Sequence, residues 1–347
     1  MAPSIAVLAT ALAALSTTVT ASNVWTVNCA PLTIQRSDPI LSLGTDSSHV
    51  HAAVGSSAFS RDMNGINGAA DSTGTTCDKF TDHSSYWSPA LYQITDSGAF
   101  QLLEFTGMNA YYQNYTCSYN ADAPGYCQGV RDAQAPPAGL RMIAGDSKRR
   151  SYDDDDLWQV AILMEAGNSG EVHGMPETLD GSRISGHARF PSCWDGVHLD
   201  SDDHRSHVSY PDPTLHGDTQ GGMCPESHPH AMINIGAQFG FNLAGITDPS
   251  KLVWSNGDLS GYGFHADFYM GWTDRDALTA SFSNCFDNNN CPWRSFGSPT
   301  GKDPNPQKLL PDTPPPFQNL GAFGPLPALP GNNPVTDVLR IRGRRAF

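Results

Sequence analysis

Histidines, carboxylates and aromatic residues gather in four stretches between Phe190 and Phe268. The sequence reads FPSCWDG at 190–196, HLDSDDHRSHVSYP at 198–211, CPESHPH at 224–230 and SNGDLSGYGFHADF at 255–268. Imidazoles and carboxylates are the side chains that most readily exchange protons or bind metal ions near neutral pH. Their density here predicts a functional site assembled from these stretches.

Asp195 and Trp194 form the first candidate pair. Cys193 precedes them, and a disulfide at that cysteine would anchor the backbone beside the carboxylate. A tryptophan beside a fixed carboxylate suits a sugar, because the indole stacks on C–H faces while the carboxylate takes hydroxyls or protons. In the competing interpretation, Trp194 packs on the disulfide in the core and Asp195 caps a turn. We treat Asp195 as a candidate catalytic residue and Trp194 as a candidate substrate contact.

Histidines follow closely spaced aspartates in the second stretch, where Asp200, His204 and His207 fall within eight residues. A carboxylate beside an imidazole fixes its tautomer and raises its pKa, which makes the imidazole a usable acid or base. His207 is therefore a candidate for proton transfer, and His204 is a candidate substrate contact. A calcium-binding loop and a solvated loop are the alternatives. His228 is a further candidate substrate contact, although Pro229 weakens any argument from regular strand geometry.

The last stretch combines chemical groups with glycines, which permit tight turns or close approach of the backbone to a ligand. His265 and Asp267 are two residues apart, so on a strand they would share one face. We take Asp258, His265 and Asp267 as candidate catalytic residues. Asn256 and Tyr262 are candidate substrate contacts.

His49 and His51 form a separate pair outside these stretches. Residues two apart on a strand face the same side, so both imidazoles could point into one pocket about seven ångströms apart. Metal sites in β folds use this spacing, with a third ligand from a distant strand. The pair predicts a site for one divalent metal ion. Hydrogen-bonded structural histidines or substrate contacts are the alternative.

The amino-terminal residues predict export. Residues 1–21 contain no charged side chain, and their apolar run at 5–15 is typical of a secretory signal and too short to span a bilayer. No later run approaches 18 apolar residues, so we expect no membrane span. The chain has eight cysteines and no Cys-x-x-Cys, which favours disulfides and an extracellular protein. Association with a cell wall is compatible with this location. We expect bridges across the short loops Cys117–Cys127 and Cys285–Cys291.

Charge and surface signals narrow the partners. The formal net charge is −15, which argues against nucleic acid or an anionic membrane as a partner. Asn114-Tyr115-Thr116 is a glycosylation sequon and predicts a surface position. The oligomeric state is not indicated by any feature of the sequence.

The composition predicts an all-β fold. Glu and Lys number five each, whereas there are 33 glycines and 26 prolines, which disfavours long helices. Apolar residues alternate with polar ones or glycine from Ile233 to Leu243, as expected of a strand with one buried face. We expect one large, disulfide-stabilised, jelly-roll-like β-sandwich over residues 22–300, with long loops and few short helices. Further expected elements are strands at 88–95, 100–105, 139–144, 158–164 and 207–210, and a helix at 274–285.

Residues 301–347 differ in character from the rest of the chain. Ten prolines lie between residues 302 and 347, and the segment has few aromatic residues and no periodicity. Such composition is typical of an extended or disordered tail.

Several motifs together resemble a known family. They are DPILSLGTDSSHVHAAVGSSAF (38–59), FPSCWDG, LDSDDHRSHVSYP, CPESHPHAMI and SNGDLSGYGFHADFYMGW. Their order over roughly residues 35–295 is similar to that in the secreted fungal and bacterial family named domain of unknown function nineteen ninety-six, some members of which carry WSC modules. The resemblance implies a secreted protein of cell-wall or biomass context and imports no reaction. The matching residues are His49, His51, Asp195, Asp200, His204, His207, His228, Asp258, His265 and Asp267. Relatives tend to have a cysteine where this chain has Gly74, which implies that Cys77 pairs elsewhere.

Three functions fit these observations. In the first, the protein acts on cell-wall or plant polysaccharide, by hydrolysis or elimination at a glycosidic bond. Asp195, Asp258 or Asp267 would then supply a carboxylate, and His207 or His265 would move a proton. In the second, it is a metalloprotein in which His49, His51 and a distant histidine such as His265 bind the ion. Oxidative chemistry is one option for such a protein. In the third, it binds glycan without catalysis.

Overall fold

The computed structural model describes residues 24–284, except 124, 126, 128, 129, 131, 168 and 169, together with residues 309–335. The predicted signal at residues 1–21 and the predicted bridge Cys285–Cys291 lie outside the described residues. Among the described residues, no helix has the length and apolar composition needed to cross a bilayer.

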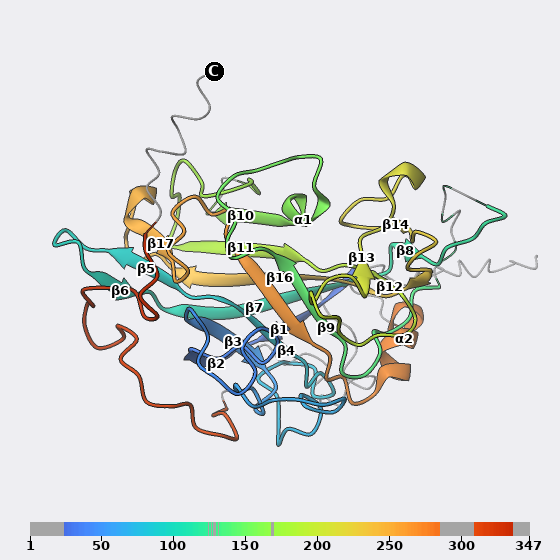
Figure 1. Ribbon diagram of the computed structural model, residues 1–347, viewed down its shortest axis with the longest axis horizontal. Helices are drawn as coiled ribbons and strands as arrows, with labels where there is room; N and C mark the ends of the chain where they lie inside the picture. Colours follow the sequence, from blue (N-terminus) through green and yellow to red (C-terminus); the bar gives the residue numbers. More distant parts are fainter. Residues whose placement is uncertain are drawn as a thin grey trace, which may run out of the picture.

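Two antiparallel five-stranded sheets form the body of the molecule and lie as stacked layers (Figure 1). The first sheet has the order β1 (Val24–Cys29), β7 (Phe105–Gln113), β16 (Asn234–Asn242), β11 (Arg183–Arg189) and β10 (Ile162–Ala166). The second has the order β2 (Pro31–Gln35), β3 (His51–Gly55), β4 (Ser85–Pro89), β18 (His265–Tyr269) and β9 (Arg141–Gly145). The alternation of residues 233–243 correctly predicted β16, the central strand of the first sheet.

The main core lies between the two sheets. Trp25, Tyr112 and Phe239 enter it from the first sheet, and Tyr86 and Phe268 enter it from the second. Each of these side chains is less than 2% exposed, and burial of one aromatic side chain of this kind contributes about 2–3 kcal/mol. The expectation of an all-β sandwich is confirmed.

The second sheet is also covered on its outer face. All residues of β3, β4 and β18 are buried, so neither face of these strands meets solvent. On the outer face, loop residues Ile40, Phe59 and Met63 form a smaller core with Trp87 and Tyr269. His51, His265 and Asp267 alternate with the inward-facing residues of their strands, which places them on this loop-covered face.

Short elements surround the two sheets. Small sheets comprise β5 (Leu91–Ile94), β6 (Phe100–Leu102) and β17 (Leu252–Trp254); β12 (Cys193–Trp194), β13 (Val208–Ser209) and β15 (His230–Ala231); and the parallel pair β8 (Thr116–Cys117) and β14 (Gly222–Met223). The helices are α1 (Leu157–Val160), α2 (Arg275–Asn284), η1 (Pro213–Leu215) and η2 (Pro249–Lys251). The helix expected at 274–285 is α2.

Three of the expected strands were drawn across element boundaries. The segment 100–105 covers β6 and the first residue of β7, which belong to different sheets. The segment 88–95 divides into the end of β4 and β5, because Ala90 lies between two different sheets. The segment 158–164 begins in α1, where Asp156 caps the helix by accepting a hydrogen bond from the Trp158 N–H. Local capping therefore starts a helix where the apolar pattern alone indicated a strand.

Three disulfides stabilise the described chain: Cys29–Cys77, Cys117–Cys127 and Cys193–Cys224. The expected short loop Cys117–Cys127 is present, and Cys77 pairs with the distant Cys29. Cys193 is bonded immediately before Trp194 and Asp195, as considered from the sequence.

The proline-rich segment is folded onto the domain where the structure describes it, so the expectation of disorder does not hold for residues 309–335. This segment, which we call the strap, runs along the outside of β5 and β6 (Figure 1). The backbones of Phe100 and Leu326 exchange two hydrogen bonds of 2.8 Å, and Leu329 is 1% exposed. Prolines give it the expected extended path, while these contacts fix it in place.

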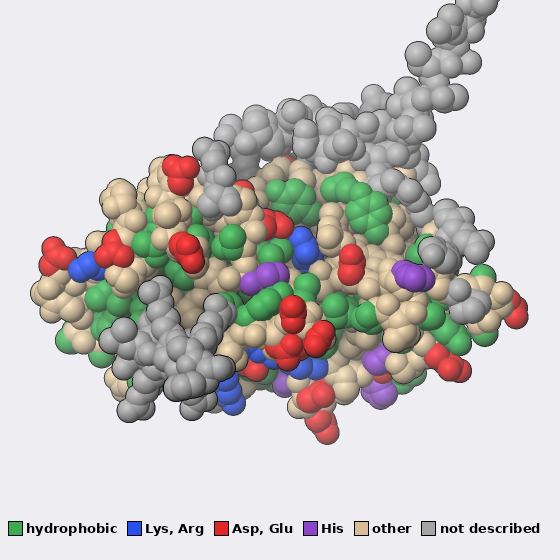
Figure 2. Space-filling model, turned by 90° about the horizontal axis from the view of Figure 1, so that it is seen from above, with side chains coloured by type: hydrophobic (Ala, Val, Ile, Leu, Met, Phe, Trp, Pro, Cys, Tyr) green, Lys and Arg blue, Asp and Glu red, His purple; other side chains and the backbone are tan. Residues whose placement is uncertain are grey.

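Asn114 of the sequon is only 7% exposed, whereas its neighbour Tyr115 is exposed. The predicted surface position is therefore wrong for Asn114, which directly follows the end of β7 and is buried there. On the face shown in Figure 2, acidic side chains are spread among neutral ones, with few Lys and Arg between them.

Candidate metal centre

Three imidazoles converge on the outer face of the second sheet. His51 begins β3 and His265 begins β18, and these strands lie on either side of β4. His51 is paired with Pro89, and continuing the register of β18 from Asp267, which is paired with Trp87, places His265 level with Pro89. In the register of the sheet, Pro89 therefore lies between His51 and His265. His49, two residues before β3, completes the group.

The three imidazole rings are close enough to bind one metal ion. Ring centroids of His49 lie 4.3 Å from those of His51 and 5.0 Å from those of His265, and the remaining pair is 5.9 Å apart. The Nε2 atoms of His49 and His265 are 3.1 Å apart. All three residues are at most 3% exposed.

Each imidazole is fixed through its outer nitrogen. The Nδ1–H groups of His51 and His265 donate to the carbonyl oxygens of Ser37 and Gly263, each at 3.0 Å. Because a carbonyl can only accept, the Nε2 of each neutral ring carries a lone pair. Nδ1 of His49 lies 3.0 Å from the Ser48 hydroxyl, which can accept or donate. Such outer hydrogen bonds orient the imidazoles of metal sites.

Burial keeps these rings neutral. It lowers the pKa of His49 and of His51 well below the ordinary value, with the neighbouring histidines adding to the effect. Burial also lowers the pKa of His265 to about 4. Neutral imidazole is the form that binds metal ions, so the cluster is in its ligating state near neutral pH.

Two carboxyl groups lie beside the imidazoles. Asp267 is fully buried, and neither of its oxygens has a hydrogen-bond partner in the described chain. Asp38 is 1% exposed, and its Oδ1 accepts hydrogen bonds from the backbone N–H groups of Ile40 and Leu41. Burial raises the pKa of both carboxyl groups. Asp38, His51 and Asp267 each offer an atom within 4.8 Å of the other two.

The three imidazoles could hold a metal ion. Tetrahedral ligands at about 2.0–2.1 Å from zinc lie about 3.3 Å apart, close to the 3.1 Å between Nε2 of His49 and Nε2 of His265. A hydrogen bond between these two atoms also fits that distance. It would leave Nε2 of His51 buried without a partner, at a cost of about 1–3 kcal/mol. A metal ion satisfies all three nitrogens.

The sequence singled out four of these residues. Spacing indicated His49 and His51 as a metal-binding pair, with His265 as a possible third ligand, and indicated His265 and Asp267 as candidate catalytic residues. Asp38 was not singled out. Its motif was noted only as part of the family resemblance, and its Asp-Pro sequence gives no sign that the side chain turns inward.

Asn256 and Asp258 lie close to the centre but have structural contacts. Asp258 accepts hydrogen bonds from the Gly263 N–H at 2.7 Å and from Ser260. Asn256 donates through Nδ2 to the Gly263 carbonyl at 2.8 Å, and this same oxygen also accepts from His265. Both residues therefore hold the glycine-rich turn that orients His265.

His207 and His228 use both ring nitrogens in the loops around residues 198–211. His207 Nε2 donates to the Arg141 carbonyl at 2.7 Å, and its Nδ1 contacts the Ser201 hydroxyl. His228 Nε2 donates to the Ser206 carbonyl at 3.0 Å, and its Nδ1 contacts the Ser227 hydroxyl. His204 donates to Asp200 at 2.8 Å. These contacts tie the loop to β9 and to its neighbours.

Asp195 lies in a surface turn, where it accepts hydrogen bonds from Val197 N–H, His198 N–H and the His198 ring, the last at 2.6 Å. Trp194 Nε1 donates to the carbonyl oxygen of the same His198. These hydrogen bonds remain within the turn and do not join the pair to the metal centre. Asp195 therefore caps a turn in the structure, as in the alternative interpretation of its sequence.

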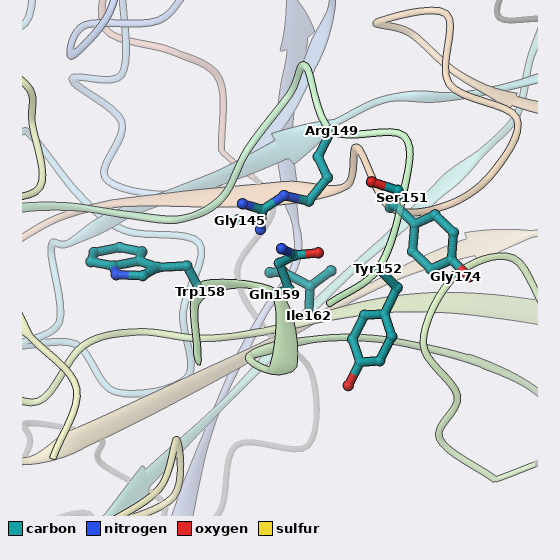
Figure 3. Close-up of a pocket in the computed structure, with 9 residues that line it drawn as sticks. Gly145, Arg149, Ser151, Tyr152, Trp158, Gln159, Ile162 and Gly174 are labelled. Carbon is teal, nitrogen blue, oxygen red and sulfur yellow. The ribbon is translucent and has the colours of Figure 1, made fainter. Parts of the chain in front are cut away.

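Tyr262 lies away from the three imidazoles, among residues that line a pocket; Figure 3 labels all the lining residues except Tyr262. Gly145, one of the lining residues, is the register partner of His265. The rings of Tyr262 and Tyr152 stack with centroids 6.1 Å apart, and Figure 3 shows the Arg149 side chain extending between Trp158 and Tyr152. The complete lining is Gly145, Arg149, Ser151, Tyr152, Trp158, Gln159, Ile162, Gly174 and Tyr262.

The fold and site define a two-sheet β protein with a buried cluster of histidines and carboxyl groups. The chain belongs to the family described as Domain of unknown function (DUF1996), whose pattern matches residues 38–272. The matched range begins at Asp38 and includes all three histidines of the centre and Asp267. No curated protein and no solved structure matches the chain.

Proposed function

We propose that this domain is a metalloprotein that binds a divalent transition-metal ion through His49, His51 and His265. The observation that carries the proposal is the convergence of three imidazoles whose outer nitrogens are engaged elsewhere. Imidazole ligands suit zinc, copper, iron and nickel. Asp38 and Asp267, once deprotonated, would add negative charge that favours a cation in the same region.

Three protein ligands would leave a further coordination position on the ion, which a water molecule could occupy. A bound ion supplies Lewis acidity, or electron transfer if it is copper or iron. The chain contributes neutral ligands, fixes their orientation through Ser37, Ser48 and Gly263, and excludes bulk water by burying the centre.

Metal analysis of the purified full chain tests this proposal. After loading with Zn²⁺ or Cu²⁺ and removal of free ion, the protein should retain stoichiometric metal. His49→Ala and His51→Ala should lose it, whereas His228→Ala, which removes a histidine bonded elsewhere, should retain it. Equal metal retention in all four proteins, or no retention in any of them, contradicts the proposal.

Polysaccharide of the cell wall or plant biomass is the second candidate ligand, bound or cleaved at the surface. The supporting observation is the pocket lined by Tyr152, Trp158 and Tyr262 with the polar groups of Arg149 and Gln159. Aromatic faces and hydrogen-bonding side chains together suit sugar rings. Titration with soluble wall oligosaccharides should show binding that Tyr262→Ala weakens and Trp194→Ala does not. Binding unaffected by Tyr262→Ala would place the glycan elsewhere.

Export of the protein belongs to the same proposal. Disulfides form and persist in oxidising compartments, and the three bridges of the described chain support an extracellular location. Fractionation of the native host culture tests it, with the protein expected in the medium or the wall fraction.

A further inference from the structure

We infer that Asp38 and Asp267 form a second cation site, next to His51, which takes a hard divalent ion such as Mn²⁺, Mg²⁺ or Ca²⁺. The inference extends the proposed function, because the second ion would lie beside the one held by the imidazoles. It rests on a different observation, the unpartnered carboxylate of Asp267.

Asp267 differs from the other fully buried carboxyl groups in the described part of the chain. Asp82 accepts hydrogen bonds from the Ser84 N–H and the Tyr86 hydroxyl. Asp258 accepts them from Gly263 and Ser260. Asp267 is equally buried, yet both of its oxygens are without a hydrogen-bond partner. Burial of an uncompensated carboxylate is so unfavourable that such a group is paired, binds a cation or takes up a proton.

Asp38 directs a second carboxyl group to the same place. Two backbone N–H groups hold its Oδ1 at 3.0 Å each, which fixes the side chain inward. Asp38, His51 and Asp267 each offer an atom within 4.8 Å of the others. No ion pair within the described residues involves either carboxylate. Two adjacent carboxylates repel each other, so they require a cation or a shared proton between them.

The two ligand groups differ in chemistry and share only His51. One group consists of His49, His51 and His265, and the other consists of Asp38, His51 and Asp267. Carboxylate oxygens suit hard cations, which retain several water ligands, whereas imidazole suits zinc or copper. Two-metal sites place their ions about 3.5–4 Å apart. Because Nδ1 of His51 donates to Ser37, its one lone pair on Nε2 can bind a single ion, so His51 would hold the first ion while Asp38, Asp267 and water hold the second beside it.

The test counts ions in the folded full chain. Protein first loaded with one equivalent of Zn²⁺ is titrated with Mn²⁺, and free Mn²⁺ is followed by electron paramagnetic resonance. We expect one further Mn²⁺ per chain in the wild type. Asp267→Asn and Asp38→Asn should each retain zinc and weaken Mn²⁺ binding at least tenfold, while Asp195→Asn, which removes a surface carboxylate, should bind both ions.

The outcomes separate this inference from the proposed function. If the wild type retains zinc but binds no Mn²⁺, the second site is overturned and the first is left intact. That result is expected if Asp38 and Asp267 share a proton and do not bind a cation. Loss of zinc in Asp267→Asn also overturns it, because Asp267 would then be a ligand of the first ion. Failure to retain zinc contradicts the proposed function, and the Mn²⁺ titration of metal-free protein still reports on the carboxylates. The wild-type titration decides the question even if a variant does not fold.

Discussion

Nε2 of His49 and Nε2 of His265 lie 3.1 Å apart, although 216 residues separate them in the chain. The two strands next to β4 bring them together, and loops from the first 70 residues close over them. The centre is therefore a product of the sandwich topology and not of any local motif.

Metal binding should stabilise the folded chain. An ion that binds the native state alone adds about 2.7 kcal/mol at a concentration 100-fold above its Kd. We expect the melting temperature of metal-free protein to rise on addition of Zn²⁺ or Cu²⁺, and chelation to reverse the rise. His51→Ala should remove most of the effect. A similar rise in wild type and His51→Ala would exclude binding at the centre.

The Ser48 hydroxyl should tune metal affinity through His49. Ser48→Ala removes the group that contacts His49 Nδ1, and loss of such an outer partner typically weakens metal binding 10–100-fold. Competition with a chromogenic chelator measures the change. Ser227→Ala is the matched control, since it removes the same contact from His228 Nδ1 outside the centre. Equal affinities of the two variants would show that the Ser48 contact is unimportant.

Asp82 should make stability depend on pH. It hydrogen bonds to Tyr86, whose hydroxyl contacts Tyr112, and burial raises its pKa to about 7. The folded state thus favours the protonated acid, so this contribution is complete below pH 3.8 and is lost as the pH rises to about 7. The loss is on the order of 4 kcal/mol at most. Asp82→Asn, which stays neutral, should unfold with a weaker pH dependence between pH 4 and 7 in urea titrations. If the unfolding free energies of the wild type and Asp82→Asn change in parallel with pH, Asp82 is not the source of the pH dependence.

The strap should stabilise the segment that carries two of the ligands. Leu329 packs in one cluster with Val50, which lies between His49 and His51, so Leu329→Ala should destabilise the protein by about 2–4 kcal/mol. Asn333→Ala removes a hydrogen bond of 2.8 Å to the Ser48 carbonyl and should speed metal release to a chelator. Phe323→Ala, at a side chain that is 97% exposed, should change neither quantity. An unchanged unfolding free energy for Leu329→Ala would mean that the strap does not support the domain.

The sequence predicted regular features better than contacts. Period-two alternation located β16, and residue spacing identified His49, His51 and His265, because both signals are local. The sequence could not show that the carboxylate of Asp258 accepts hydrogen bonds from Ser260 and Gly263. Nor could it show that His207 donates one to the Arg141 carbonyl. Those partners depend on how loops fold back. Similarly, proline content predicted the extended path of the strap, whereas its attachment depends on the distant residues Phe100 and Ser48.

The position of the strap has a consequence for biogenesis. His265 is made 216 residues after His49, and the Asn333 that holds Ser48 is made later still. The three imidazoles can therefore meet only after the strands of the first sheet have been synthesised. An ion of the proposed kind would find its full set of nitrogens only from that point on.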